Sequence, residues 1–152
     1  MFQYQLIPYL NFGGDAEEAL AVYIEAFAGK VEELHFYSEN PELAKQFPES
    51  CHSMVMHATF RSPDLHFMAS DVTNDPASGC SITQRNPAGS TVSLSINSTS
   101  LEEQQRVFDV LARNAQEVTM TLQDTFWGAR FGMLTDKFGI KWLFNYDYPV
   151  RS

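Results

Sequence analysis

Residues 9–27 have the sequence YLNFGGDAEEALAVYIEAF, in which an aromatic and branched run is followed by two glycines and an amphipathic segment. The run predicts a β-strand over residues 3–12, and the apolar spacing after the glycines predicts a helix. Asp15 is a favourable N-cap residue, and Glu18 completes a capping-box pattern. Gly29 is expected to end the helix in the left-handed conformation. The first two elements are therefore a strand and a capped helix.

The same pattern recurs in the second half of the chain. Residues 91–97 alternate between apolar and polar side chains, which predicts a strand, and Ser100 with Glu103 forms a second capping-box pattern. Shifting the first half by 85 positions (100 − 15) places Asp15 on Ser100. Three further strands are predicted in each half, at 31–37, 52–60 and 65–71 and at 117–122, 128–135 and 139–146.

A βαβββ unit that occurs twice is an internal duplication. It predicts an α+β fold in which two βαβββ modules form cupped mixed or antiparallel sheets. We place the first module at residues 1–71 and the second at residues 90–147, within a single domain of residues 1–152. The turn-rich segment 72–89 then connects the modules, either as a linker or as a functional loop.

Composition limits the classes of protein to which the chain can belong. Its 152 residues carry a net charge of −9 and are 44% hydrophobic, which is typical of one soluble globular domain. An acidic chain without a basic stripe argues against a nucleic-acid partner, and the lack of a long apolar run argues against a membrane span. The N-terminus has no secretory pattern, so a cytoplasmic location is expected. Two cysteines, Cys51 and Cys80, are predicted to be free thiols.

Several strings of residues together resemble one known family. They are PYLNFGGDAEEAL at 8–20, MHA at 56–58, SD at 70–71, FWG at 126–128 and FGMLTDKFGIKW at 131–142. The doubled βαβββ pattern resembles the vicinal oxygen chelate superfamily, which includes glyoxalase I, bleomycin-resistance proteins and extradiol dioxygenases. The strings resemble its PhnB-like branch. The resemblance implies a glyoxalase/bleomycin-resistance-like fold, a cytoplasmic homodimer and cupped clefts, in which metal-using members of the superfamily hold their ion.

The metal site of the superfamily is not expected in this chain. By resemblance, the ligand positions fall near Pro8, near Met68 or Ser70, on Thr91 and on Leu143. The divalent ions concerned are held by imidazole and carboxylate groups, and none of these side chains supplies one. We therefore predict neither a cofactor nor the superfamily's Lewis-acid mechanism.

A rearranged metal centre is the alternative, and it would be built on His57 and Asp71. The predicted hairpin places His57 opposite Met68 and Thr59 opposite His66, which makes the two histidines diagonal neighbours. The protein would then be a glyoxalase- or dioxygenase-like lyase or isomerase, with His57 and Asp71 as candidate catalytic residues. The simpler interpretation is that His57 is a hydrogen-bonded strand residue.

Two groups of side chains are candidates for small-molecule binding. Polar residues would line the cleft, and an aromatic pair with one cation would lie at its mouth. The first group is Ser70, Thr91, Ser93 and His57, and the second is Phe126, Trp127 and Arg130. Core packing at a strand bend is an equal alternative for the aromatic pair.

The sequence thus favours a small-molecule-binding protein of undefined activity. The metal-dependent enzyme is its alternative, and a dimeric scaffold without a ligand is a third class. A methyltransferase is rejected on architecture. Residues 13–15 follow a strand and open a helix, but no third glycine completes a dinucleotide-type turn, and two long helices accompany about eight strands.

Overall fold

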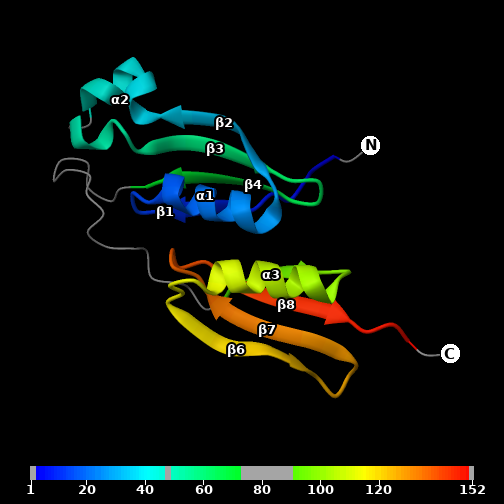
Figure 1. Cartoon of the computed structure of the whole chain (residues 1–152). Coiled ribbons are helices and arrows are strands. Elements are labelled where there is room, and N and C mark those ends of the chain that lie inside the picture. Colours follow the sequence, from blue (N-terminus) through cyan, green and yellow to red (C-terminus); the bar gives the residue numbers. More distant parts are fainter. Residues whose placement is uncertain (1–2, 47–48, 73–90, 151–152) are drawn as a thin grey trace. The chain divides into compact units, whose positions relative to one another are not determined.

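The computed structural model of the chain describes residues 3–46, 49–72 and 91–150 (Figure 1). The chain divides into two compact units, Met1–Asn86 and Pro87–Ser152. Each unit contains a four-stranded mixed sheet and a 12-residue helix. Apart from Val72, the predicted connecting segment 72–89 lies outside the described residues.

The first unit has the predicted order of strand, helix and three strands. Its elements are β1 (Tyr9–Phe12), α1 (Ala16–Phe27), β2 (Lys30–Phe36), β3 (Val55–Arg61) and β4 (His66–Asp71). Between β2 and β3 the chain forms η1 (Tyr37–Glu39), α2 (Pro41–Gln46) and η2 (Glu49–Cys51). The strand order is β1-β4-β3-β2, in which β1 is parallel to β4 and the other neighbours are antiparallel.

The second unit repeats this arrangement. Its elements are β5 (Leu94–Asn97), α3 (Leu101–Ala112), β6 (Glu117–Asp124), β7 (Ala129–Thr135) and β8 (Lys141–Asp147). The strand order is β5-β8-β7-β6, and β5 is parallel to β8. Because both sheets place the strand before the helix beside the last strand of the unit, the predicted duplicated α+β fold is confirmed.

Helix α1 packs on one face of the first sheet through small and aromatic side chains (Figure 1). Ala19 and Tyr23 of the helix are fully buried, and the Tyr23 ring meets Phe67 edge-to-face with 5.8 Å between centroids. Phe67 in turn stacks on Phe60 of β3 at 4.5 Å. These contacts fix which strand residues point to the helix and which point to the other face.

Helix α3 covers one face of the second sheet in the same way. Phe108 of α3 meets Phe144 of β8 with 5.2 Å between ring centroids, and Trp142 of β8 is also buried. The Trp142 indole donates a hydrogen bond to Asp136 Oδ2 at 2.9 Å. Asp136 Oδ1 accepts two backbone N–H groups of the β7–β8 turn, so this buried carboxylate ties the turn to the core.

Both ends of α1 differ from the prediction. Asp15 makes no side-chain capping hydrogen bond, and Asp71 at the end of β4 instead accepts backbone amides at the start of the helix. The left-handed residue at the C-terminal end is Ala28 (φ 52°), and Gly29 follows it. Glycine is needed at position 29 for another reason, because a Cβ there would lie 2.2 Å from Cζ of Phe60.

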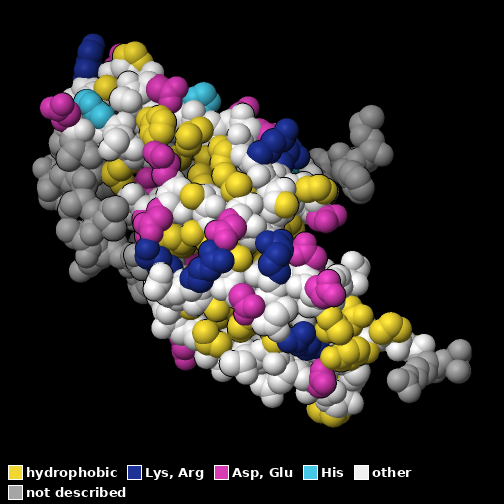
Figure 2. Space-filling view, in the orientation of Figure 1, with side chains coloured by type: hydrophobic (Ala, Val, Ile, Leu, Met, Phe, Trp, Pro, Cys, Tyr) yellow, Lys and Arg dark blue, Asp and Glu magenta, His cyan; other side chains and the backbone are white. Residues whose placement is uncertain are grey.

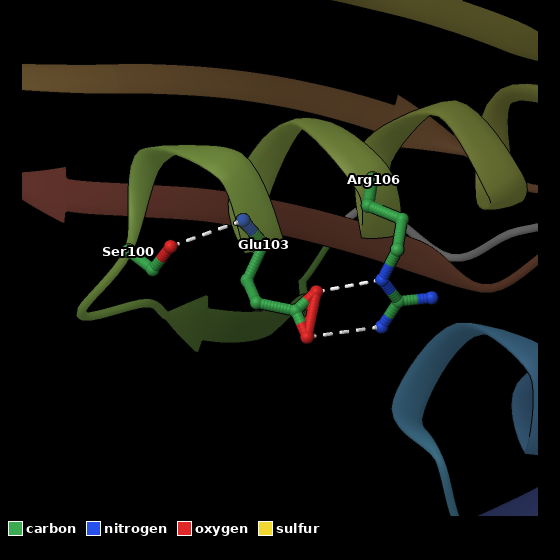
Figure 3. Close-up of polar contacts among 3 residues, drawn as sticks. All are labelled: Ser100, Glu103 and Arg106. Atoms are coloured by element: carbon green, nitrogen blue, oxygen red, sulfur yellow. Dashed lines mark hydrogen bonds and ion pairs between the residues drawn. The ribbon is translucent and has the colours of Figure 1, made fainter.

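The start of α3 agrees with the prediction. Ser100 Oγ accepts the backbone N–H of Glu103 at 3.3 Å (Figure 3). The Glu103 carboxylate binds Arg106 one turn later, with 2.6 Å between Oε2 and Nε. Hydrogen bonding to this guanidinium lowers the pKa of Glu103 below its usual value. Ser100 therefore caps the helix as the capping box predicts, whereas the Glu103 side chain forms an ion pair with Arg106.

The first strand of each unit begins later than predicted. Strand β1 starts at Tyr9, and Leu6 before it is 98% exposed. Strand β5 starts at Leu94, and Val92 before it is 72% exposed. In both places the β-like sequence extends beyond the four residues that pair with the neighbouring strand.

The cysteine prediction is wrong at Cys51. This residue is fully buried at the end of η2 and is disulfide-bonded. Cys80 lies outside the described residues.

Charged side chains are mixed on the face of the molecule drawn in Figure 2, where Lys and Arg lie among Asp and Glu. Surface ion pairs contribute to this mixing, and one joins Arg61 Nε to Glu32 Oε2 at 2.7 Å. None of the helices in residues 3–46, 49–72 and 91–150 combines the length and the hydropathy of a membrane-spanning segment.

Candidate functional site

The first sheet has one face that α1 does not cover, and we call it the open face. Leu10 and Phe12 of β1 are buried on the helix side. Side chains alternate along a strand, so Tyr9 and Asn11 point to the open face. The same alternation applies to the other three strands, whose register is known.

One row of residues crosses the whole sheet on the open face. Met68 of β4 is the Cα partner of both Tyr9 in β1 and Thr59 in β3. Glu33 of β2 is in turn the partner of Thr59. Together with the neighbouring positions, the open face comprises Tyr9, Asn11, Glu33, His35, His57, Thr59, Met68 and Ser70.

His57 connects two hydroxyl groups on this face. Its Nδ1 lies 3.4 Å from the Tyr9 hydroxyl, and its Nε2 lies 3.3 Å from Thr59 Oγ1. The Tyr9 and His57 rings are 6.0 Å apart between centroids. Thr59 is only 8% exposed, whereas Tyr9 is 42% exposed. The three side chains therefore form a polar chain that runs from the sheet toward solvent.

The predicted pairing of β3 with β4 is wrong by two positions. The structure pairs Thr59 with Met68 and Arg61 with His66. The predicted pairs were His57 with Met68 and Thr59 with His66. The difference arises because β3 extends to Arg61 and β4 begins at His66, so the turn is centred one residue later. His57 and His66 are consequently not diagonal neighbours.

Asp71 belongs to the helix side of the sheet and is fully buried. Its Oδ1 accepts the backbone N–H groups of Gly14 at 2.8 Å and Ala16 at 2.9 Å. Its Oδ2 accepts the N–H of Val55 at 2.9 Å. Both carboxylate oxygens are thus committed to backbone amides, and the structure does not bring Asp71 together with His57.

Tyr37 links the end of β2 to the same strand end. Its hydroxyl donates a hydrogen bond to the backbone oxygen of Asp71 at 3.0 Å. Burial raises the pKa of Tyr37 above its ordinary value, and the negative charges that Asp71 and Tyr9 carry when ionised add to the effect. Tyr37 is therefore a fixed, protonated donor that holds the β4 terminus.

The predicted polar lining residues fall in different places. Ser70 lies in β4 and is 5% exposed. Thr91 and Ser93 are exposed and precede β5 in the second unit. The structure therefore places Ser70 beside the hydroxyl chain of the first unit, and it gives Thr91 and Ser93 no strand position.

The aromatic pair lies in the turn between β6 and β7. Phe126 is 98% exposed and Trp127 is 59% exposed, so core packing does not explain these rings. Trp127 is 6.5 Å from Phe131 between ring centroids, whereas the Arg130 guanidinium bonds to Gln105 of α3. Arg130 and Phe131 are consecutive in a strand and point to opposite faces. The predicted cation and aromatic pair are therefore separated.

The sequence matches the family described as 3-demethylubiquinone-9 3-methyltransferase over residues 4–144. The chain belongs to this family. Protein YjdN of Escherichia coli (strain K12) is 33% identical to it over 147 residues, which cover 92% of this chain and 93% of YjdN.

Two solved structures are similar to this chain over almost their whole length. Protein PA1353 from Pseudomonas aeruginosa is 33% identical, with a TM-score of 0.77 over 97% of this chain and 100% of PA1353. A PhnB protein from Bacillus cereus, titled a putative 3-demethylubiquinone-9 3-methyltransferase, is 26% identical, with a TM-score of 0.73 over 94% of this chain and 99% of its own. The predicted resemblance to the PhnB-like branch is confirmed.

The superfamily fold is confirmed as well. A glyoxalase/bleomycin resistance protein/dioxygenase from Nocardioides is 16% identical, with a TM-score of 0.54. The match covers 100% of this chain and 89% of the Nocardioides chain. At this identity the likeness concerns the fold alone.

The positions that the resemblance gives to the superfamily's metal ligands carry Pro8, Met68 or Ser70, Thr91 and Leu143, whose side chains supply neither imidazole nor carboxylate. Across residues 3–46, 49–72 and 91–150, no three His, Cys, Asp or Glu residues gather in a way that could hold a metal ion. The two nitrogens of His57 face hydroxyl groups, and Asp71 is saturated by amides.

Sequence reasoning missed Tyr9 as a site residue and gave Thr59 no role. A local signal existed, because Tyr9 alternates with the buried residues Leu10 and Phe12. Its contact with His57, however, depends on the parallel pairing of β1 with β4, which joins residues from opposite ends of the unit.

Proposed function

We propose that this PhnB-family protein binds a small molecule on the open face of the first sheet, without the metal ion of its superfamily. The hydrogen-bonded chain of Tyr9, His57 and Thr59 is the observation that carries the proposal. Polar side chains that join on a sheet face opposite the helix are suited to orienting a ligand.

The surroundings of the chain complete a binding surface of mixed character. Met68 supplies apolar contact between Tyr9 and Thr59, and Glu33 contributes a carboxylate in the same row. Small-molecule sites typically combine apolar contact area with a few placed polar groups. On this surface the sheet holds the side chains in place and Met68 offers apolar contact to a ligand. The hydrogen-bonded chain of Tyr9, His57 and Thr59 would orient the ligand.

The rearranged metal-dependent enzyme has less support. It needs the Asp71 carboxylate near His57, but that carboxylate accepts three backbone N–H groups on the other face of the sheet. Freeing it would leave buried amides without partners, at a cost of roughly 1–3 kcal/mol each. The family description names a methyl transfer, and this pair of βαβββ sheets does not have the alternating β and α units of a doubly wound cofactor fold.

The proposal extends to a homodimer, as the resemblance implies. Physical support comes from the sheet edges. The strand orders leave β1 and β2 at the edges of one sheet, and β5 and β6 at the edges of the other. Edge strands present backbone groups that favour pairing with further strands or need cover. Light scattering after size exclusion would test the dimer, and a monomer at micromolar concentration would contradict it.

A ligand screen tests the binding function. The full-length protein, purified without a tag, is melted in the presence of a metabolite library at several concentrations. A binder raises the melting temperature in proportion to the logarithm of ligand concentration. We expect at least one such compound, with the shift lost in His57→Ala and retained in Arg106→Ala, which removes the ion pair with Glu103 on α3. A screen without any shift, or a shift that His57→Ala leaves intact, would contradict the proposal.

A further inference from the structure

We infer that the Tyr9 hydroxyl is the hydrogen-bond donor of this site, that Thr59 sets its direction through His57, and that the matching ligand group is a neutral carbonyl oxygen. This inference rests on the proposed function. It concerns the direction of the hydrogen bonds from Thr59 to His57, from His57 to Tyr9 and from Tyr9 to the ligand. The positions of the side chains and their burial together determine this direction.

The direction begins at Thr59. The Thr59 residue is only 8% exposed, and within the described part of the chain its Oγ1 lies 3.3 Å from His57 Nε2. A buried hydroxyl that does not donate loses a hydrogen bond it could make with water, so donation to Nε2 is favoured. Thr59 therefore acts as donor and His57 Nε2 as acceptor.

This donation fixes the tautomer of neutral His57. A neutral imidazole carries its proton on one nitrogen only, and when Nε2 accepts, the proton is on Nδ1. Nδ1 lies 3.4 Å from the Tyr9 hydroxyl and donates to its oxygen. Tyr9 then has no need to give its own hydrogen to His57, and because Tyr9 is 42% exposed, that hydrogen points to solvent or to a ligand.

The charge of the chain and of the open face selects the ligand group. A carbonyl oxygen accepts the phenolic hydrogen. A carboxylate would also accept it, but it would approach a chain of net charge −9. The open face itself carries Glu33, three strands from Tyr9, and Arg61 of β3 is already paired with Glu32 at 2.7 Å. An ammonium group has no lone pair to accept the hydrogen. A neutral carbonyl compound with an apolar body to cover Met68 therefore fits best.

The tautomer can be measured without any ligand. Nitrogen-15 NMR of the full-length protein at pH 8 should show His57 protonated on Nδ1, with the signal assigned by its loss in His57→Gln. Thr59→Val should shift His57 toward the Nε2–H form, while Thr59→Ser, which keeps the hydroxyl, should preserve Nδ1–H. An Nε2–H tautomer in the native protein would overturn the inference.

Ligand choice is tested with three probes that share one ring: cyclohexanone, cyclohexylammonium and cyclohexanecarboxylate. NMR titration should show the ketone perturbing the signals of Tyr9, His57 and Thr59 more strongly than the other two. Tyr9→Phe should weaken ketone binding roughly tenfold, the equivalent of one hydrogen bond. Tyr4→Phe, which removes a phenol that is 87% exposed, should leave it unchanged.

The outcomes separate this inference from the proposed function. If a compound from the screen binds through His57 but the tautomer is Nε2–H, or if the carboxylate or ammonium probe binds better than the ketone, the binding function stands and the inference falls. Equal ketone binding by Tyr9→Phe and the native protein would overturn it as well.

Discussion

The Oδ1 atom of Asp71 lies 2.9 Å from the backbone nitrogen of Ala16, although 55 positions separate the two residues in the chain. The last strand of the first unit thus supplies the acceptor that the start of its helix needs. A negative charge at this end of a helix is also favoured by the helix dipole. The residue that resembled a catalytic carboxylate in the sequence is the clamp between β4 and α1.

Asp71→Asn should therefore lower the free energy of unfolding by about 2–4 kcal/mol, because the charged acceptor of buried amide hydrogen bonds is lost. Urea denaturation measures the change. Asp64→Asn, in the exposed hairpin turn, is the matched control and should stay within about 0.5 kcal/mol of the native protein. A similar small change for Asp71→Asn would contradict the clamp.

Gly29→Ala should destabilise the first unit by about 1–3 kcal/mol through overpacking. The new Cβ would lie 2.2 Å from the Phe60 ring and 2.8 Å from the backbone oxygen of Arg61. Gly128→Ala introduces a methyl group into open space, at a φ of +85°, and should cost only the left-handed strain of about 1–2 kcal/mol. The loss of stability caused by Gly29→Ala should be smaller in a Phe60→Leu background than in the native protein. Thermal denaturation of the four variants and the native protein tests this.

Phe126→Ser should change the unfolding free energy by less than about 0.5 kcal/mol, because the ring is 98% exposed and buries little area on folding. Phe144→Ser, at a fully buried ring of the same unit, provides the contrast and should be severely destabilising. Chemical denaturation of both variants checks the expectation. A loss of several kcal/mol in Phe126→Ser would restore the core-packing interpretation of the aromatic pair.

Elemental analysis of protein purified without a tag should find no stoichiometric divalent ion. The reason is the donor set, since the structure commits Asp71 to amides and gives His57 two hydroxyl neighbours. Added Mn²⁺, Zn²⁺ or Ni²⁺ should not raise the melting temperature, and His57→Ala should behave as the native protein does. One bound ion per chain that disappears in His57→Ala would support the rearranged metal centre instead.

The Glu103 carboxyl should titrate below its usual range in the folded protein, because Arg106 donates hydrogen bonds to it. The pKa is lowered on folding, so the stabilisation is complete above the unfolded pKa and is lost as pH falls through the folded pKa. The pair is exposed, so its effect on stability should be small. Carbon-detected NMR titration should show the depressed pKa, and Arg106→Ala should raise it toward the ordinary value. An unchanged Glu103 pKa in Arg106→Ala would contradict this assignment.

The duplicated fold was predictable because its signals are local. Alternation in the strands and the cap at Ser100 are properties of short segments, and both appear in the structure. The β3–β4 register was not predictable, since a shift of the turn by one residue leaves the apolar pattern almost unchanged. The sequence predicts the left-handed residue at Gly29, but it is Ala28. Glycine is needed at position 29 because the Phe60 ring leaves no room for a Cβ.

The candidate site was predictable only in part. His57 was singled out because it lies on a mixed strand face. Tyr9 was not, since its neighbour across the sheet is 48 positions away. Asp71 was a candidate catalytic residue because the sequence does not reveal which face of β4 its side chain points to. Nor does it reveal from which backbone amides the carboxylate accepts hydrogen bonds.

The parallel pairing of β1 with β4 has a consequence for synthesis on the ribosome. Tyr9 leaves the exit tunnel before the strand beside it, His66–Asp71, which is the last of its unit to emerge. Until then the growing polypeptide has neither the Asp71 contacts to the helix nor the complete open face, and both arise together when β4 inserts between β1 and β3. A nascent chain stalled before residue 66 should thus be inert toward ligand.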